Sequence, residues 1–285
     1  MPIKAVQQMM LGKVLKSEEE TLTVLETVRA AGYDGIELNG YMIRPTPLFV
    51  RALTAAAGMP AGKGGRYDWP GLTRSAGLAV VALHQDLGTI QKNPDAVLEQ
   101  AGGLGTDKVV VTGMYRFDYT DETALAGLCR ELNHYGAYFR QAGVELLYHN
   151  HNVELCRLKG REQRAYDFLL TNTDPTAVNF EFDSYWFTDG GANAVKWMEK
   201  LGRRMRLWHI NDRGTRQKGA AITPIVKADS IELGYGSMDL DSLTAAAKAN
   251  GIAAVVLESH RNHVDGDPVK SLQRSAAYLN RHFSR

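Results

Sequence analysis

Histidines and acidic residues gather at the ends of short apolar runs in this chain. Five of its eight histidines stand at such ends, and carboxylates close several of the same runs. Imidazoles and carboxylates can transfer protons, and together they can hold a divalent cation. The candidate residues are Glu37, His84, His149, His151, Glu154, Asp183, His209, Glu258 and His260.

A metal site accounts for this set better than isolated roles do. A lone interior histidine is more often a core residue with satisfied hydrogen bonds, and a lone aspartate at a strand end is often a helix cap. Charged groups that converge without a partner are costly to bury, so a cation is the simple way to satisfy them together. We expect one divalent ion with nitrogen and oxygen ligands. Mn²⁺ is favoured, and Co²⁺, Zn²⁺, Mg²⁺ or Fe²⁺ would also suit.

Eight runs of strand character alternate with longer segments of helical periodicity. Apolar residues recur three or four positions apart in Glu19–Ala30 and Thr123–Ala142, for example. Alternating strands and helices imply parallel pairing, and eight units favour closure into a single (β/α)8 TIM barrel over residues 1–285. A doubly wound open sheet is the alternative. The predicted strands are Ile3–Met10, Gly35–Leu38, Leu78–His84, Lys108–Thr112, Val144–His149, Val178–Asp183, Met205–Ile210 and Ala253–Glu258.

Composition excludes several classes of function. The chain has 285 residues, 33 Lys and Arg, and 32 Asp and Glu, for a net charge of +1. This balance does not favour nucleic acid as a partner, because binding the phosphate backbone needs clustered positive charge. No apolar stretch reaches the roughly 18 residues of a membrane span, and Met1–Lys16 lacks the features of a secretory signal. With only two cysteines, Cys129 and Cys156, a cytoplasmic location is expected.

Several strand-end segments resemble the xylose-isomerase-like TIM-barrel superfamily. This is the family of sugar phosphate isomerases and epimerases, which also holds inosose dehydratase and the endonuclease IV branch. The resemblance runs nearly end to end and is specific for the superfamily rather than for a substrate. The segments that carry it are Tyr33–Leu38, Tyr148–Glu154, Phe182–Trp186, His209–Asp212 and Gly234–Asp239.

The resemblance implies a metal held by residues from strands five to eight. Asp183, His209 and Glu258 match the last three ligand positions directly. At the first position the family's epimerases carry a glutamate, where this chain has His149. Either His149 replaces that carboxylate, or the loop folds back and Glu154 binds. We expect Glu154 to be the ligand and His149 to be catalytic.

The same departure bears on the reaction that the resemblance implies. Epimerases of the family use two glutamates on opposite faces of the substrate, whereas His149 and Glu258 would form the pair here. We expect proton abstraction next to the carbonyl of a keto sugar or keto polyol, in an isomerase or epimerase. The alternative is β-elimination, as in inosose dehydratase or in related barrels that cleave 3-keto-glycosides or C-glycosides. An endonuclease IV-like hydrolase is the rival from another class, and the balanced charge disfavours it.

Further residues at the predicted rim are expected to contact the substrate. They are Glu37, His84, His151, Trp186 and His260, whereas Trp208 could wall the pocket or pack the barrel. Phosphate recognition would need basic residues in the loops, for which Arg44, Arg116, Arg213 and Arg261 are candidates. The loop Arg213–Ser237 is long, which is typical of functional loops. The protein could assemble as a homo-oligomer or with a small partner subunit, and the sequence does not decide between these assemblies.

Overall fold

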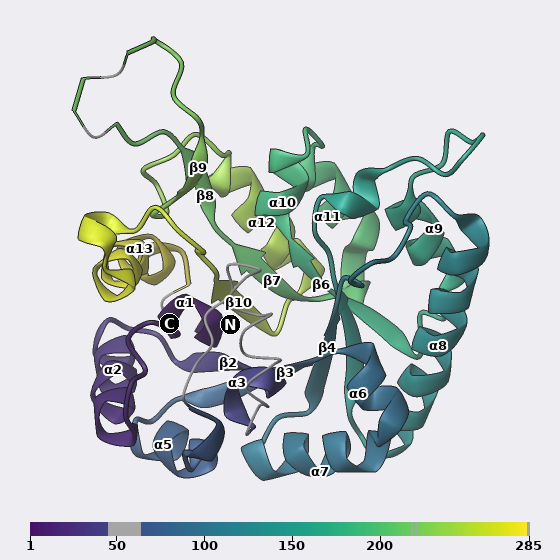
Figure 1. Ribbon diagram of the computed structural model, residues 1–285, viewed down its shortest axis with the longest axis horizontal. Helices are drawn as coiled ribbons and strands as arrows, with labels where there is room; N and C mark the ends of the chain where they lie inside the picture. Colours follow the sequence, from purple (N-terminus) through teal and green to yellow (C-terminus); the bar gives the residue numbers. More distant parts are fainter. Residues whose placement is uncertain (45–63, 218, 221, 284–285) are drawn as a thin grey trace.

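The computed structural model describes residues 1–44, 64–217, 219–220 and 222–283. Within them, parallel strands close into a barrel in the order β1-β10-β7-β6-β5-β4-β3-β2, with the helices outside it (Figure 1). This confirms the predicted (β/α)8 barrel. The strands are β1 (Ile3–Gln7), β2 (Gly35–Asn39), β3 (Ala79–Gln85), β4 (Lys108–Thr112), β5 (Glu145–His149), β6 (Val178–Asp183), β7 (Met205–Ile210) and β10 (Ala254–Leu257).

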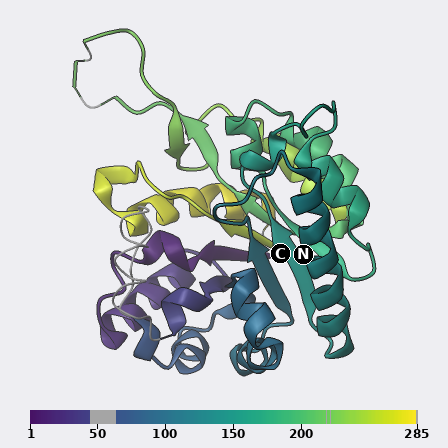
Figure 2. The ribbon, with the colours of Figure 1, turned by 45° about the vertical axis from the view of Figure 1, so that its right-hand side comes forward.

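Helices cover the outer surface of the barrel, as the turned view makes clear (Figure 2). Among the helices of the described residues, none is long and apolar enough to cross a membrane. The α-helices are α1 (Gln8–Leu11), α2 (Glu18–Ala30), α3 (Gly40–Ile43), α5 (Trp69–Ser75), α6 (Leu87–Lys92), α7 (Pro94–Leu104), α8 (Glu122–Gln141), α9 (Ala165–Asn172), α10 (Ser184–Asp189), α11 (Ala194–Leu201), α12 (Leu240–Asn250) and α13 (Pro268–Phe283). Short 3₁₀ turns are η1 (Gly64–Arg66), η2 (Val153–Leu155), η3 (Gly202–Arg204) and η4 (Val264–Gly266).

Local side-chain hydrogen bonds set several element boundaries. The first strand is shorter than predicted, because the Gln7 side chain accepts the backbone N–H of Met9 at 2.8 Å and begins α1. Asn93 caps α7 in the same way, with its Oδ1 3.1 Å from the backbone nitrogen of Ala96, and proline follows at the first helical position. Gly251 ends α12 in the left-handed region, at φ +72°.

The two-residue period of the strands builds the barrel interior in layers. On β5 and β7, the inward-facing Leu147 and Leu207 belong to a small apolar cluster of the barrel interior. Two positions later on each strand stand His149 and His209, both buried. The apolar layer therefore supports a polar layer at the carboxyl ends of the strands, where barrel enzymes carry their active sites.

The long loop after β7 contains a short antiparallel hairpin. β8 (Asp212–Gly214) pairs antiparallel with β9 (Asp229–Ile231), and the hairpin projects from the barrel (Figure 1). Asp212 anchors the segment that follows β9, because its carboxylate accepts the backbone N–H groups of Gly234, Gly236 and Met238 at 2.9–3.1 Å. The loop predicted at Arg213–Ser237 therefore includes most of an antiparallel hairpin.

Candidate metal centre

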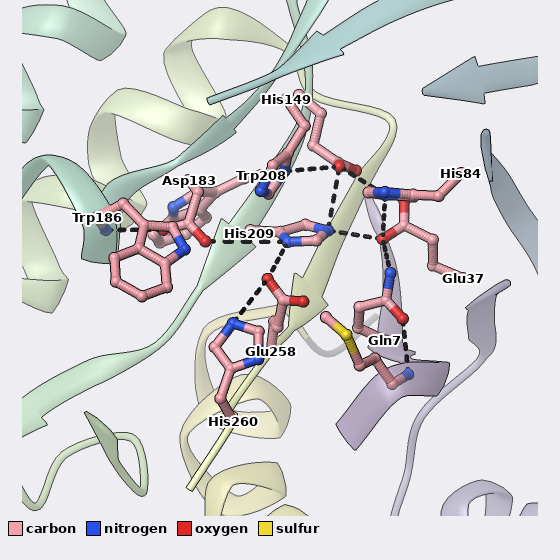
Figure 3. A network of polar contacts seen from close by, with 12 residues as sticks. Gln7, Glu37, His84, His149, Asp183, Trp186, Trp208, His209, Glu258 and His260 are labelled. Atoms are coloured by element: carbon pink, nitrogen blue, oxygen red, sulfur yellow. Dashed lines mark hydrogen bonds and ion pairs between the residues drawn. The ribbon is translucent and has the colours of Figure 1, made fainter. Parts of the chain in front are cut away.

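Four buried side chains meet at the carboxyl ends of four barrel strands. Each offers one ligand atom, and these atoms lie within 4.8 Å of one another. His209 lies in their midst (Figure 3), with its Nδ1 2.9 Å from Glu258 Oε2 and 4.0 Å from Asp183 Oδ2. We call this set the outer group: His149, Asp183, His209 and Glu258. It contains three of the four predicted metal ligands.

Asp183 combines a structural role with a place in the outer group. Its Oδ1 caps α10 by accepting the backbone N–H of Trp186 at 3.0 Å, while its Oδ2 faces His209. Asn150 ties the ends of β5 and β6 together, because its side-chain amide makes two 3.0 Å hydrogen bonds to the backbone of Asp183. Asp183 is therefore held from two sides.

The electrostatics of the outer group suit a divalent cation. Burial and the neighbouring Glu258 raise the pKa of Asp183 to about 8, so this carboxyl resists ionising without a positive partner. Burial opposes ionisation of Glu258 as well, but His260 and His209 outweigh it and lower the pKa of Glu258. The set offers two carboxylates and two imidazoles, whose nitrogen and oxygen donors match the ligand preferences of Zn²⁺ or Mn²⁺.

Glu154 lies outside this group, contrary to the predicted ligand set. Its Oε1 accepts the hydroxyl of Tyr148 at 2.7 Å, and its Oε2 accepts the backbone N–H of His151 at 2.9 Å. One oxygen thus binds a side chain of β5, and the other binds the backbone of the loop that follows it. Gly113 makes room for this arrangement, since a Cβ there would meet His151 Nδ1 at 3.0 Å and Glu154 Oε1 at 3.2 Å. His149 takes the strand-five place in the outer group.

A second set of buried side chains lies beside the outer group and shares His209 with it. We call this the inner group: Glu37, His84, Glu181 and His209. His209 Nε2 lies 2.6 Å from Glu37 Oε2, and His149 Nδ1 lies 3.0 Å from Glu181 Oε2. Glu37 and Glu181 are 0% exposed. Glu37 and His84, which we expected to touch substrate, instead contact other side chains of the site.

His84 lies between the two inner carboxylates. Its Nε2 is 3.0 Å from Glu37 Oε2 and 2.9 Å from Glu181 Oε2. Burial by itself would lower the pKa of His84, but Glu37 and Glu181 outweigh it and raise the pKa to about 10. This imidazole is therefore positively charged at neutral pH in the metal-free protein.

The predicted rim residues form a partly exposed aromatic wall beside the outer group. The rings of His151 and His260 each lie 5.8 Å from the Trp186 ring, centroid to centroid. Burial lowers the pKa of His151 to about 3, so this imidazole is neutral. His260 Nε2 lies 3.7 Å from Glu258 Oε2. The structure thus brings Trp186, His151 and His260 together beside the outer group.

Other candidates have structural partners. Trp208 is fully buried on the outer face of β7, where its Nε1 donates to Ser184 Oγ at 3.0 Å, so it packs the barrel. Arg213 Nε lies 3.0 Å from Asp189 Oδ1, and Arg261 Nε lies 3.9 Å from Asp229 Oδ2.

Sequence reasoning missed Glu181 and Gln7 as members of the site. Gln7 Nε2 donates to Glu37 Oε2 at 3.2 Å, and its Oε1 accepts from Asn39 at 2.6 Å. For Glu181 a signal existed: it precedes Asp183 by two positions on one strand, so both side chains point into the barrel.

Similarity to known proteins assigns the chain to a family. The family model described as "Xylose isomerase-like TIM barrel" matches residues 25–282. Inosose dehydratase of Mesomycoplasma hyopneumoniae (strain 7448) is 32% identical over 95 residues, a match that covers 33% of this chain and only 30% of the length of that relative.

Solved structures of related barrels superpose over almost the whole chain. A sugar phosphate isomerase/epimerase from Parabacteroides distasonis has a TM-score of 0.76 and 22% identity, over 97% of this chain and 92% of that one. The IolI protein, solved with a zinc atom, has a TM-score of 0.64 and 18% identity, over 99% and 100% of the two chains. At these identities the likeness shows the shared fold. Since the family model matches most of its residues, the chain belongs to the xylose isomerase-like TIM barrel family.

Proposed function

We propose that the protein is a metal-dependent enzyme that removes a proton next to the carbonyl of a keto sugar or keto polyol. The observation that carries this proposal is the outer group, four buried nitrogen and oxygen ligand atoms within 4.8 Å of one another at the active-site end of the barrel. It is supported by two proteins of similar fold, one named as a sugar phosphate isomerase/epimerase and the other, the IolI protein, solved with a zinc atom.

His149, Asp183, His209 and Glu258 are the residues that would hold the ion. Mn²⁺ remains the favoured ion, and Zn²⁺ fits the same donor set. When bound, the ion supplies Lewis-acid stabilisation of the negative charge that develops on a carbonyl oxygen as a proton leaves the neighbouring carbon. His149 is thereby reassigned from catalyst to ligand, since its Nδ1 faces Glu181 and its Nε2 is left for the ion.

Proton transfer is assigned to Glu258 and its neighbour His260. Because His260 and His209 lower its pKa, Glu258 is ionised at neutral pH and can accept a proton. The imidazole of His260, 3.7 Å away, is placed to exchange a proton with this carboxylate. Neutral His151 offers hydrogen bonds to substrate hydroxyls, and Trp186 offers an apolar face to a sugar ring.

β-Elimination of water is the second candidate reaction. It begins with the same proton abstraction and then expels a hydroxyl from the next carbon. The observation that favours it is the sequence similarity to inosose dehydratase, which extends over 95 residues. The two reactions differ in the mass of the product, so one experiment can separate them.

The test is turnover in D₂O by protein loaded with Mn²⁺, on a panel of ketoses, inososes and 3-keto-glycosides. We expect metal-dependent entry of deuterium at the carbon next to the carbonyl. Mass spectrometry and NMR would detect it. An isomeric product indicates isomerisation or epimerisation, and loss of water indicates elimination. Glu258→Gln should slow the exchange by roughly 10²-fold or more. Glu199→Gln, on the exposed face of α11, is the matched control.

Two outcomes would overturn the proposal. Turnover of a keto sugar without deuterium exchange would indicate a hydride shift in place of proton abstraction. Cleavage of abasic DNA, with no activity on the panel, would favour an endonuclease IV-like hydrolase.

A further inference from the structure

The inner group contains the contacts expected of residues that orient metal-binding histidines. An imidazole has two ring nitrogens, and the hydrogen bond made by one decides which is left for a cation. His209 Nε2 contacts Glu37 Oε2 at 2.6 Å, whereas its Nδ1 belongs to the outer group. His149 Nδ1 contacts Glu181 Oε2 at 3.0 Å. Each imidazole of the outer group therefore has at least one carboxylate behind it.

The two carboxylates are joined through His84. Its Nε2 lies within 3.0 Å of one oxygen of each, and Gln7 Nε2 donates to the same oxygen of Glu37. Without such a bridge, two fully buried carboxylates would repel each other at close range. The bridge holds one oxygen of each carboxylate beside an imidazole of the outer group. It comes from β3, a strand that contributes nothing to the outer group.

From these contacts we infer that Glu37 and Glu181, bridged by His84, are positioning residues that set the ring orientation and tautomer of His209 and His149. The inference rests on the proposed metal site and adds the residues that prepare it. Glu181 is the shared element, because its Oε2 also lies 3.2 Å from His209 Nε2. Hydrogen-bonded carboxylates behind metal-binding histidines make the imidazole a better ligand, and their loss typically weakens metal binding by roughly 10–100-fold.

The first measurement is metal affinity without substrate, by competition with a chelator. Glu37→Gln and Glu181→Gln keep the side-chain shape and remove the charge. Each should weaken Zn²⁺ or Mn²⁺ binding by roughly 10–100-fold. Glu145→Gln is the matched control, because the Glu145 carboxylate pairs with Arg206 at the opposite end of β5. This variant should bind metal as tightly as the wild type does. Unchanged affinity in both inner variants would overturn the inference.

The second measurement is imidazole ¹⁵N NMR of the wild-type protein, which does not depend on any variant folding. We expect His149 to carry its proton on Nδ1, in metal-free and Zn²⁺-loaded protein alike. His209 should keep its Nε2 proton when Zn²⁺ binds. In Glu181→Gln the His149 proton should shift toward Nε2, a change that a merely structural role for Glu181 would not produce. A wild-type His149 protonated on Nε2 alone would contradict the inference.

Metal stoichiometry separates this inference from a different role for the inner group. One ion per chain in the wild type agrees with a positioning role. Two ions per chain, falling to one in Glu181→Gln, would make the inner group a second metal site and overturn it. A wild type that binds no metal would instead defeat the proposed function, and the His149 tautomer in the metal-free protein would still test the inference.

Discussion

The hydroxyl of Tyr148 donates a 2.7 Å hydrogen bond to Glu154, and this contact directs the Glu154 carboxylate away from the metal centre. Tyr148 lies on the outer face of β5, whereas the neighbouring His149 points into the barrel. The pair explains why His149, and not Glu154, lies in the outer group.

Variants at these two positions should therefore behave differently. His149→Ala should lose metal affinity by more than the roughly 10–100-fold expected for an orienting residue, because it removes a ligand. Glu154→Gln should keep metal, since Gln can still accept the N–H of His151. Chelator competition measures both. Loss of metal in Glu154→Gln, with retention in His149→Ala, would restore the ligand set predicted from sequence.

Asp183→Ala should leave the purified protein without its ion, because it removes a carboxylate that faces His209 Nδ1. It also removes the cap of α10, so stability should fall as well, by about 1 kcal/mol. Asp183→Asn separates the two effects, since its amide oxygen can still cap the helix. Elemental analysis and thermal unfolding are the measurements. Stoichiometric metal in Asp183→Ala would refute the assignment.

Metal binding should release protons at neutral pH. In the metal-free protein the pKa of Asp183 is about 8, raised by burial and Glu258, so this carboxyl is mostly protonated at pH 7. Burial alone would lower the pKa of His209, but Glu181, Glu37 and Glu258 raise it well above 6.5, so its Nδ1 also holds a proton. Affinity should consequently increase as pH rises from 6 toward 9. Calorimetry in two buffers with different ionisation enthalpies counts the protons, and a pH-independent affinity would contradict the expectation.

His84 should make stability depend on pH in the metal-free protein. Its folded pKa is about 10, against an ordinary value of 6.5. A raised folded pKa stabilises the folded state fully below pH 6.5, and this contribution is lost as pH rises from 6.5 to about 10. The stability advantage of wild type over His84→Gln should accordingly shrink across that window in urea titrations. An advantage that stays constant or grows would show that His84 is not charged.

Trp186 should affect substrate binding and leave metal binding intact. Its ring lies 5.8 Å from each of the His151 and His260 rings, centroid to centroid. Its backbone N–H, which donates to Asp183, is kept in any variant. Trp186→Ala should raise KM, and Trp186→Phe should retain part of the apolar wall. Steady-state kinetics on an active substrate, with a metal assay alongside, provide the test. An unchanged KM would place the substrate elsewhere.

Much of the architecture was readable from the chain alone, because the signals are local. The strand runs and the helical periods depend on neighbours a few residues away, and they predicted the barrel. Strand-end chemistry also predicted that Asp183, His209 and Glu258 would lie together, since parallel strands bring their carboxyl ends to one rim.

The assignment of individual atoms needed the closed barrel. Glu37 and His209 are 172 positions apart, and only closure puts their side chains 2.6 Å from each other. Folding of the loop after β5 placed Glu154 against the hydroxyl of Tyr148 and left His149 in the outer group. The inward side chains of the barrel form layers, and the layer in which a residue lies decides how deeply it is buried. Glu37 and Glu181 are therefore fully buried, whereas Trp186 and His260 are partly exposed, and residue type alone does not predict this difference. Chemistry could be inferred from strand ends, whereas the choice of ligand atom and its hydrogen-bonded support depended on long-range packing.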